Sequence, residues 1–196
     1  MAKSSFAITV DELTLAKARK GDMEAMGEIY QLFEGPVYTL AIRICSSPAD
    51  AEDVLQETFL KLFQKLNQFR GDSPFWGWLR KIAINTALTK LRQEVNGPSA
   101  LDGVFIRKSA VHESVHNSDP ADAIDLDSKL SRLPAVTRTV LWLHTVEGYT
   151  HAEIAEMMGK TESFSKSQLS RAYEKLRKWL RWNNTAEQDI QARQNS

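Results

Sequence analysis

The chain has 196 residues, of which 42% are hydrophobic, with 25 basic and 25 acidic side chains and a single cysteine, Cys45. This composition is typical of a globular protein of one or two domains, and a lone cysteine excludes a disulfide framework and favours the reducing cytoplasm. Because no stretch approaches the roughly 18 to 20 apolar residues of a membrane span and the start lacks a signal peptide's apolar core, neither membrane insertion nor secretion is expected.

The first 95 residues carry a succession of helix start and stop signals. A capping side chain or proline opens each predicted helix, and glycine, proline or asparagine closes it. Gly35-Pro36 is expected to break the second helix, which runs toward Phe33, and to restart the chain. Residues 69–73 are expected to form a loop before a last long helix. In chain order the signals are Asp11 and Gly21, Asp22 and Gly35-Pro36, Ser47-Pro48 and Asn67, and Pro74 and Asn96-Gly97-Pro98.

A polar stretch separates this helical region from a second one. Residues 96–120 shift to Gly, Ser, Asp, His and Asn without a sustained hydrophobic period, which predicts a flexible linker. Helical patterning returns over residues 124–133, 135–146, 150–158 and 164–182. No strand-type alternation is present, so the predicted fold class is all-α. The predicted domains are residues 10–95 and 121–183, joined by the linker and followed by a polar tail, 184–196.

The last two predicted helices have the pattern of a helix-turn-helix. Thr150 can cap a short helix, Gly159 can take the left-handed turn position, and a longer basic helix follows, with seven Lys or Arg against two Glu over residues 159–183. Its polar front could contact base edges and phosphates, whereas an ordinary helical hairpin is the alternative. In this helix we expect a buried stripe of Leu169, Ala172, Tyr173, Leu176, Trp179 and Leu180 and an exposed face of Lys166, Gln168, Ser170, Arg171 and Lys175.

Aromatic and cationic side chains gather around residues 69–85. Rings beside Arg and Lys provide the stacking surface and the charge that favour unpaired bases. Trp76 and Trp78 diverge by about 200° on a helix, so one of them is expected in the core. Asn85, farther along the same helix, could read a base, although packing of a small bundle explains any single ring equally well.

The helix that starts near Ser47 opens with carboxylates and an amide: Asp50, Glu52, Asp53, Gln56 and Glu57. Negative charge in a first turn complements the helix dipole, so routine capping explains this cluster. A docking face for a basic partner helix is the functional alternative, and the residues alone leave both open.

Two other motifs fail on their context. His112-Glu113-Ser114-Val115-His116 matches the H-E-x-x-H pattern of zinc proteases, and the corresponding hypothesis is a zinc hydrolase using His112, Glu113 and His116. The motif lies in the polar linker rather than on a buried helix. Gly159-Lys160-Thr161 lacks the first glycine and the preceding strand of a phosphate-binding loop. We therefore expect no catalytic set, no metal site and no cofactor, and Cys45 is expected to be a small core residue.

Three blocks of sequence follow one another along the chain. The first is residues 50–59. The second is residues 69–73 with 78–79 and 82–86, and the third is residues 133–134 with 148–155 and 166–172. Together they resemble the extracytoplasmic-function (ECF) group of the bacterial sigma-70 family, the promoter-recognition subunits of RNA polymerase. In that family the first block is the polymerase-docking helix, the second melts and reads the downstream promoter element, and the third binds the upstream element.

The resemblance implies a non-enzymatic transcription initiation factor for a stress or envelope-type regulon. Its implied partners are the clamp helices of the beta-prime subunit of core RNA polymerase, promoter DNA in duplex and melted form, and an anti-sigma factor. The residues implied to bind core polymerase are Asp50, Asp53, Gln56 and Glu57. Those implied at the downstream element are Phe69, Ser73, Trp76, Lys81 and Asn85, and those at the upstream element are Lys166, Ser167 and Arg171.

The second domain departs from the family's pattern at two positions. Lys160 and Ser165 stand where the family usually has aliphatic residues. Phe164 is expected to replace them as the buried anchor, which would rotate the recognition helix.

The alternative function is a stand-alone DNA-binding regulator that uses only the basic domain. That alternative leaves the acidic and aromatic clusters of the first domain unexplained.

Overall fold

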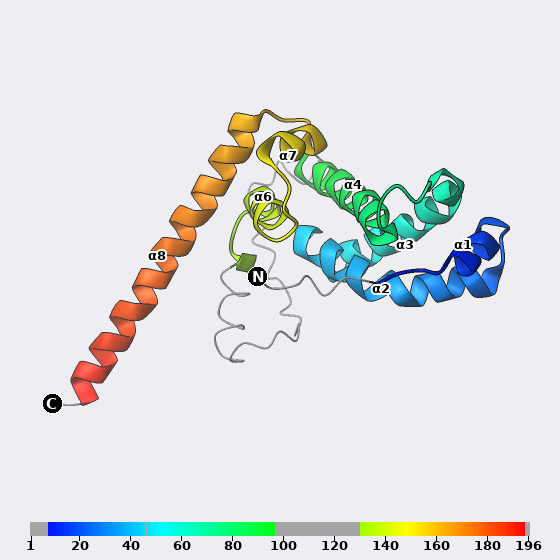
Figure 1. Cartoon of the computed structure of the whole chain (residues 1–196). Coiled ribbons are helices and arrows are strands. Elements are labelled where there is room, and N and C mark those ends of the chain that lie inside the picture. The colour runs from blue at the N-terminus through cyan, green and yellow to red at the C-terminus, as the bar shows by residue number, and fades with distance from the viewer. Residues whose placement is uncertain (1–7, 46, 97–129, 195–196) are drawn as a thin grey trace. The chain divides into compact units, whose positions relative to one another are not determined.

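The structure is a computed structural model that describes residues 8–45, 47–96 and 130–194. The chain forms two compact units, Met1–Gly103 and Val104–Ser196, and each is considered by itself. Every regular element in the described residues is helical (Figure 1), which confirms the predicted all-α fold class. The predicted linker beyond residue 96, and the predicted helix over 124–133 as far as residue 129, lie outside the described residues.

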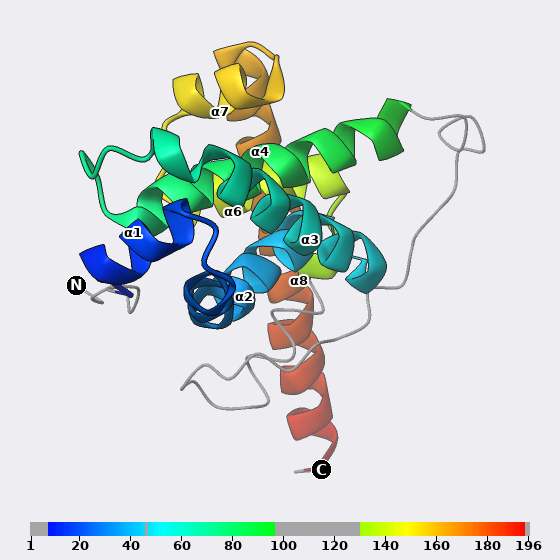
Figure 2. The ribbon, with the colours of Figure 1, turned by 90° about the vertical axis from the view of Figure 1, so that its right-hand side faces the viewer.

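The first unit is a bundle built around one long helix. α1 (Glu12–Arg19) packs on α2 (Met23–Cys45), while α3 (Pro48–Lys65) and α4 (Phe75–Asn96) pack on α2 and on each other. A short 3-10 turn, η1 (Leu66–Gln68), follows α3 and contacts α1. Figures 1 and 2 show that α1 and the loop between η1 and α4 lie at the same end of this unit.

The predicted capping residues of this unit are observed. The Asp11 carboxylate accepts a hydrogen bond from the backbone N–H of Thr14 at 2.9 Å, and Asp22 caps α2 in the same way. Ser47 caps α3, whose first residue is Pro48. These side chains satisfy backbone N–H groups that the first helical turn leaves without a partner, so the starts of the helices are readable from sequence.

The predicted break at Gly35-Pro36 is wrong, because α2 continues through both residues to Cys45. Proline inside a helix removes one backbone hydrogen bond and costs about 3 kcal/mol. The residues after it nevertheless continue the buried stripe of the helix, and burying each large apolar side chain contributes about 1.5–3 kcal/mol. Packing therefore outweighs the local penalty. The stripe comprises Ile29, Phe33, Val37, Leu40, Ala41 and Ile44, each at most 3% exposed.

The core of the first unit lies where α2, α3 and α4 meet. Its largest fully buried side chains are Ile29, Phe33, Val37 and Ile44 of α2, Val54 and Leu62 of α3, Leu66 of η1, and Leu79, Ile84 and Leu88 of α4. Since each helix turns its apolar side inward, the polar sides of α3 and α4 face solvent.

The second unit contains the predicted helix-turn-helix. α6 (Ala135–Thr145) and α7 (His151–Met158) both pack on α8 (Glu162–Gln194). Thr150 caps α7 in a capping box: its backbone N–H donates to the Glu153 carboxylate at 2.8 Å, and its hydroxyl accepts from the Glu153 N–H at 3.2 Å. Gly159 ends α7 with a φ of 62°, the left-handed conformation that glycine adopts without strain.

The recognition helix is longer than predicted. α8 begins at Glu162, two residues before the expected start, and continues to Gln194 instead of ending at Trp182 (Figure 1). Residues 183–194 contain no glycine or proline, and Ala, Glu, Gln and Arg in this stretch favour helix. Most of the predicted polar tail is therefore a continuation of α8.

Candidate nucleic-acid interface

The front of α8 presents a polar and basic face. Lys166, Ser167 and Arg171, the residues predicted to meet the upstream promoter element, are all exposed. On the opposite side Leu169 and Ala172 are buried, as predicted. A helix that is anchored on one side and carries ammonium, hydroxyl and guanidinium groups on the other can bind bases and phosphates in a groove of DNA.

Two predicted positions on α8 are wrong, and both concern its rotation. Gln168, expected in solvent, is 7% exposed, and its side-chain carbonyl accepts a hydrogen bond of 2.7 Å from the hydroxyl of Thr137 on α6. Tyr173, expected in the buried stripe, is 40% exposed. The buried side of α8 therefore includes Gln168 and excludes Tyr173, in contrast to the predicted stripe. Gln168 can be buried without a large penalty because its side chain has a hydrogen-bond partner.

Ser165 is a second polar residue on the buried side of α8, and it supports the same rotation of the helix. Its side chain is 0% exposed, and its Oγ lies 3.0 Å from Nδ1 of His151 on α7. Phe164, predicted to replace it as the buried anchor, is only half-buried, and its ring centroid lies 5.9 Å from Nζ of Lys160. The predicted substitution of Phe164 for Ser165 is therefore wrong. A hydrogen-bonded serine keeps the inward position.

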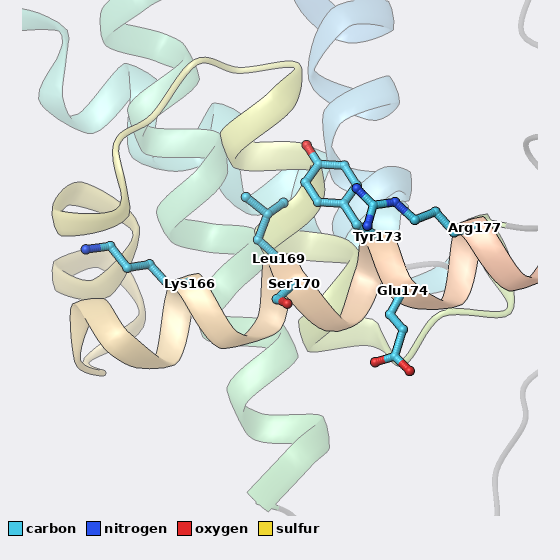
Figure 3. A pocket seen from close by; sticks show the side chains of 6 residues that line it. All are labelled: Lys166, Leu169, Ser170, Tyr173, Glu174 and Arg177. Atoms are coloured by element: carbon cyan, nitrogen blue, oxygen red, sulfur yellow. The ribbon is translucent and has the colours of Figure 1, made fainter.

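A shallow hollow runs along one side of α8. In Figure 3 the Tyr173 ring and the Arg177 side chain lie on one side of the helix, while the Glu174 carboxylate points the opposite way. The hollow is open to solvent and combines apolar, hydroxyl and cationic groups with one acidic residue, Glu174. Its hydroxyl and cationic groups can contact a DNA backbone. It is lined by Lys166, Leu169, Ser170, Tyr173, Glu174 and Arg177.

Lys166 makes an ion pair within α8. Its Nζ lies 2.7 Å from the Glu162 carboxylate, and this hydrogen bond lowers the pKa of Glu162. The two side chains are 60% and 52% exposed. An ion pair this exposed is weak, so Lys166 remains available to a phosphate.

The outer face of α3 carries the predicted docking residues. Helical spacing places Asp53, Gln56 and Glu57 on one face, and all three are exposed. The side chains of Asp53 and Glu57 are 63% and 55% exposed, whereas that of Asp50 is only 15% exposed. The structure thus brings the four residues together, with Asp50 at the edge nearest the bundle.

Two lysines that the sequence did not single out lie among these acids. Lys90 of α4 reaches α3, with its Nζ 2.7 Å from the Asp53 carboxylate and 3.4 Å from that of Asp50. The hydrogen bond to Asp53 is the main cause that raises the pKa of Lys90. Lys61 pairs with Glu57 at 2.7 Å. The spacing of four residues could have revealed the second pair, but only the packing of α4 on α3 reveals the first.

Leu60 also lies on this outer face and is 63% exposed. It is seven residues after Asp53 and three after Glu57, so helical spacing places it beside them. We define the α3 docking face as Asp53, Gln56, Glu57 and Leu60.

The aromatic side chains near the loop are divided between the core and the surface. Phe69 is 8% exposed, and its ring packs on Phe75 and Trp78 with centroids 5.2 Å and 5.3 Å apart. Trp76 stacks on Phe33 of α2, at 5.8 Å and an interplanar angle of 5°. The rings of Phe69 and Trp76, both predicted to meet DNA, thus help to build the bundle and hold the loop.

The polar side chains predicted at the downstream element lie on the surface. Ser73, Lys81 and Asn85 are exposed. Lys81 and Asn85 are four residues apart on α4 and share a face, and the spacing of seven residues places Trp78 on that side as well. Trp76 lies about 180° from Asn85 around the helix axis. The half-buried Trp78, rather than Trp76, therefore lies on the same side of α4 as Asn85, about two turns away along the helix.

A helix-turn-helix with a basic recognition helix defines a DNA-binding protein, and the comparisons with known proteins identify its family. Residues 29–96 match Sigma-70 region 2, and residues 123–176 match Sigma-70, region 4. The RNA polymerase sigma-H factor of Pseudomonas aeruginosa is 29% identical over 180 residues, which cover 87% of this chain and 93% of that protein. The ECF RNA polymerase sigma factor SigW of Bacillus subtilis is 27% identical over 180 residues, covering 85% and 95%.

A solved structure agrees with these relatives. The sigma factor RpoE of Bartonella quintana, crystallised in complex with the anti-sigma factor NepR, is similar with a TM-score of 0.57 and 28% identity over 79% of this chain and 96% of that one. The chain therefore belongs to the ECF group of the sigma-70 family.

The other motifs lead to no second site within the part of the chain that is described. There, no group of three or more His, Cys, Asp or Glu could hold a metal ion, and no helix is long and apolar enough to cross a membrane. His112, Glu113 and His116 lie outside the described residues. Cys45 is buried, which agrees with the predicted core role.

A histidine of α6 and a histidine of α7 stack on each other, on two helices that pack against α8. The rings of His144 and His151 have centroids 4.4 Å apart and an interplanar angle of 15°. Burial lowers the pKa of His151, and His144 and Lys166 lower it further, against an opposing effect of Glu162. Two protonated rings at this distance would repel each other, so neutral His151 suits the folded unit.

We predict that acid weakens the second unit through His151. Its pKa is lower when folded than when unfolded, so the unfolded chain binds the proton first and stability is lost as the pH falls below about 6.5. Thermal unfolding from pH 8 to pH 5 should show a smaller decrease for His151→Gln than for the unmodified chain. Equal slopes in the two proteins would contradict this role.

Proposed function

We propose that this sigma factor binds core RNA polymerase through the α3 docking face and directs it to promoters that the front of α8 and the loop of residues 69–73 recognise. The observation that carries this proposal is that the chain presents an acidic helix face in one unit and a basic recognition helix in the other. The first suits a basic protein surface and the second suits DNA. The protein would act by binding polymerase and DNA, without catalysing a reaction, in the cytoplasm where the polymerase acts.

Family membership supports this function over the two alternatives. A stand-alone regulator needs only the second unit, whereas residues 29–96 of the first unit match Sigma-70 region 2 as well, which supports a function for both units. A zinc hydrolase would depend on residues 112–116, which neither family match includes. A further proposed partner is an anti-sigma factor, because the similar Bartonella protein was solved with one.

The chemistry of the α3 docking face suits basic helices such as the clamp helices of the beta-prime subunit. Leu60 provides an exposed apolar contact, and Asp53 and Glu57 place negative charge in the two turns that precede it. Both carboxylates already pair with lysines of this chain, but exposed pairs contribute only about 0–1 kcal/mol. A partner's cations can therefore replace Lys90 or Lys61, or share the same carboxylates, at little cost.

We predict that the double substitution Asp53→Lys and Glu57→Lys lowers the affinity for purified core polymerase by about tenfold or more, because each change replaces attraction by repulsion at the interface. The control is Glu24→Lys with Glu34→Lys, which makes the same charge change at exposed positions of α2. Core binding and transcription in vitro from a genomic library measure the effect. Affinity that is unchanged in the docking-face variant, or equally lowered in the control, would exclude this face.

On α8 we predict that Lys166→Ala and Arg171→Ala each weaken binding of the holoenzyme to duplex upstream DNA by about 1–3 kcal/mol if they contact bases or make charge-assisted contacts. A residue that contacts a base should also lose preference at one base pair. A residue that contacts phosphate should reduce the salt dependence for all sequences. Lys178→Ala removes one charge farther along the same helix and serves as the control. Affinity and base preference unaffected by both substitutions would mean that another face of α8 meets the DNA.

The loop and α4 would act after duplex binding, by capturing a base of the melted nontemplate strand. A base read by a pocket must leave the stack, which costs a few kcal/mol that new contacts must offset. Asn85 provides an exposed amide for hydrogen bonds, and Trp78 provides a ring on the same side of α4.

We predict that Asn85→Ala impairs open-complex formation more than it impairs initial duplex binding. The measurement is permanganate reactivity of unpaired thymines around the start site, at matched occupancy of the promoter. Gln93→Ala, which removes another exposed amide from α4, is the control. Reactivity equal to that of the unmodified protein would exclude Asn85 from base capture. Phe69→Ala is a poorer test, because it empties part of the aromatic cluster and destabilises the unit.

A further inference from the structure

Arg19, the last residue of α1, reaches across to the start of the loop. Its Nη2 donates a hydrogen bond of 2.8 Å to the backbone carbonyl of Phe69, and its Nε lies 3.5 Å from the carbonyl of Leu66. Leu66 opens η1, and Phe69 is the residue at which the chain leaves that turn. One guanidinium therefore holds both ends of η1, and the second end is the point from which residues 70–73 depart.

The attachment of α1 to the bundle does not depend on this contact. α1 packs on α2, and Leu15 and Ala18 of α1 are only 4% and 5% exposed, so apolar burial holds the helix in place. The Arg19 head group can consequently be removed while α1 stays packed on α2. Its long methylene stem contributes packing of its own, which a substitution should preserve.

We propose that Arg19 is a positioning residue for base capture: it fixes the direction in which the loop of residues 70–73 leaves the bundle. The proposal rests on the base-capture part of the proposed function. The Phe69 ring anchors the side chain in the aromatic cluster, and Arg19 anchors the carbonyl of the same residue. Two anchors on one residue restrict its backbone, so the first exposed loop residue starts from a defined orientation.

A restricted loop matters because base capture has to order that loop. Residues 70–73 are all exposed, and Gly71 has a φ of 81°, which only glycine adopts readily. Ordering such a segment on binding costs conformational entropy, and a preset starting direction removes part of that cost. Arg19 would thus favour the base-bound state without touching the base.

The test replaces Arg19 in the full-length protein assembled with core polymerase. Arg19→Met keeps the stem and removes both donors, Arg19→Lys restores one donor and the charge, and Lys17→Met removes a charge from an exposed position of the same helix. Asn85→Ala serves as a reference for lost base contact. The readouts are core affinity, duplex binding, permanganate reactivity, and the preference of the holoenzyme for a nontemplate oligonucleotide over one with the captured base replaced.

We expect Arg19→Met to lower promoter melting and base preference by about tenfold, the equivalent of one charged hydrogen bond, while core affinity and duplex binding stay near those of the unmodified protein. Arg19→Lys should recover part of the loss, and Lys17→Met should show none. Melting and base preference that are normal in Arg19→Met but impaired in Asn85→Ala would overturn the positioning role. An equal loss of all four readouts would also overturn it, because it would indicate a general defect of the fold. An unmodified protein that neither binds core nor melts a promoter would overturn the proposed function itself.

Discussion

The buried stripe of α2 is the constraint on which the first unit depends. It packs against both α3 and α4 and passes through Pro36 without interruption. If the chain had broken there, Val37 and Ile44 would not share a face with Ile29 and Phe33, and α3 and α4 would have no common support. With the stripe intact, both helices turn their apolar sides inward, and their outer faces become the surfaces proposed for polymerase and DNA.

Local signals in the sequence were sufficient to locate most helix boundaries. Asp11, Ser47, Thr150 and Gly159 act within one turn of their own position, through hydrogen bonds or backbone conformation that involve near neighbours. Such effects are readable without knowledge of the fold. Pro36 gave the opposite result. Its local penalty is exceeded by the burial of α2 side chains against α3 and α4, and the sequence pattern does not measure that burial.

The rotation of α8 shows a second limit of sequence patterns. A hydrophobic stripe places Tyr173 inside and Gln168 outside, yet the structure has the reverse. Gln168 is buried because Thr137, 31 residues earlier, provides its partner, and Ser165 is buried beside His151. Hydrophobicity alone assigns polar residues to solvent, and it does not show which of them will find a hydrogen-bond partner inside the fold. The exposure of Lys166, Ser170, Arg171 and Lys175 was nevertheless predicted correctly, because these residues lie opposite the centre of the buried arc or on its flank.

The proposed surfaces differ in the rigidity that their tasks require. A groove of duplex DNA has a defined shape, so a recognition helix reads it best when its rotation is fixed. Hydrogen bonds between Gln168 and α6 and between Ser165 and α7 fix the rotation of α8. A base that leaves the stack has no fixed position until it is captured, so a loop that can adjust is better suited to receive it. Complete freedom would raise the entropic cost, whereas complete rigidity would prevent adjustment. A loop held at its base by Arg19 and by the Phe69 ring, with exposed residues beyond, lies between these limits.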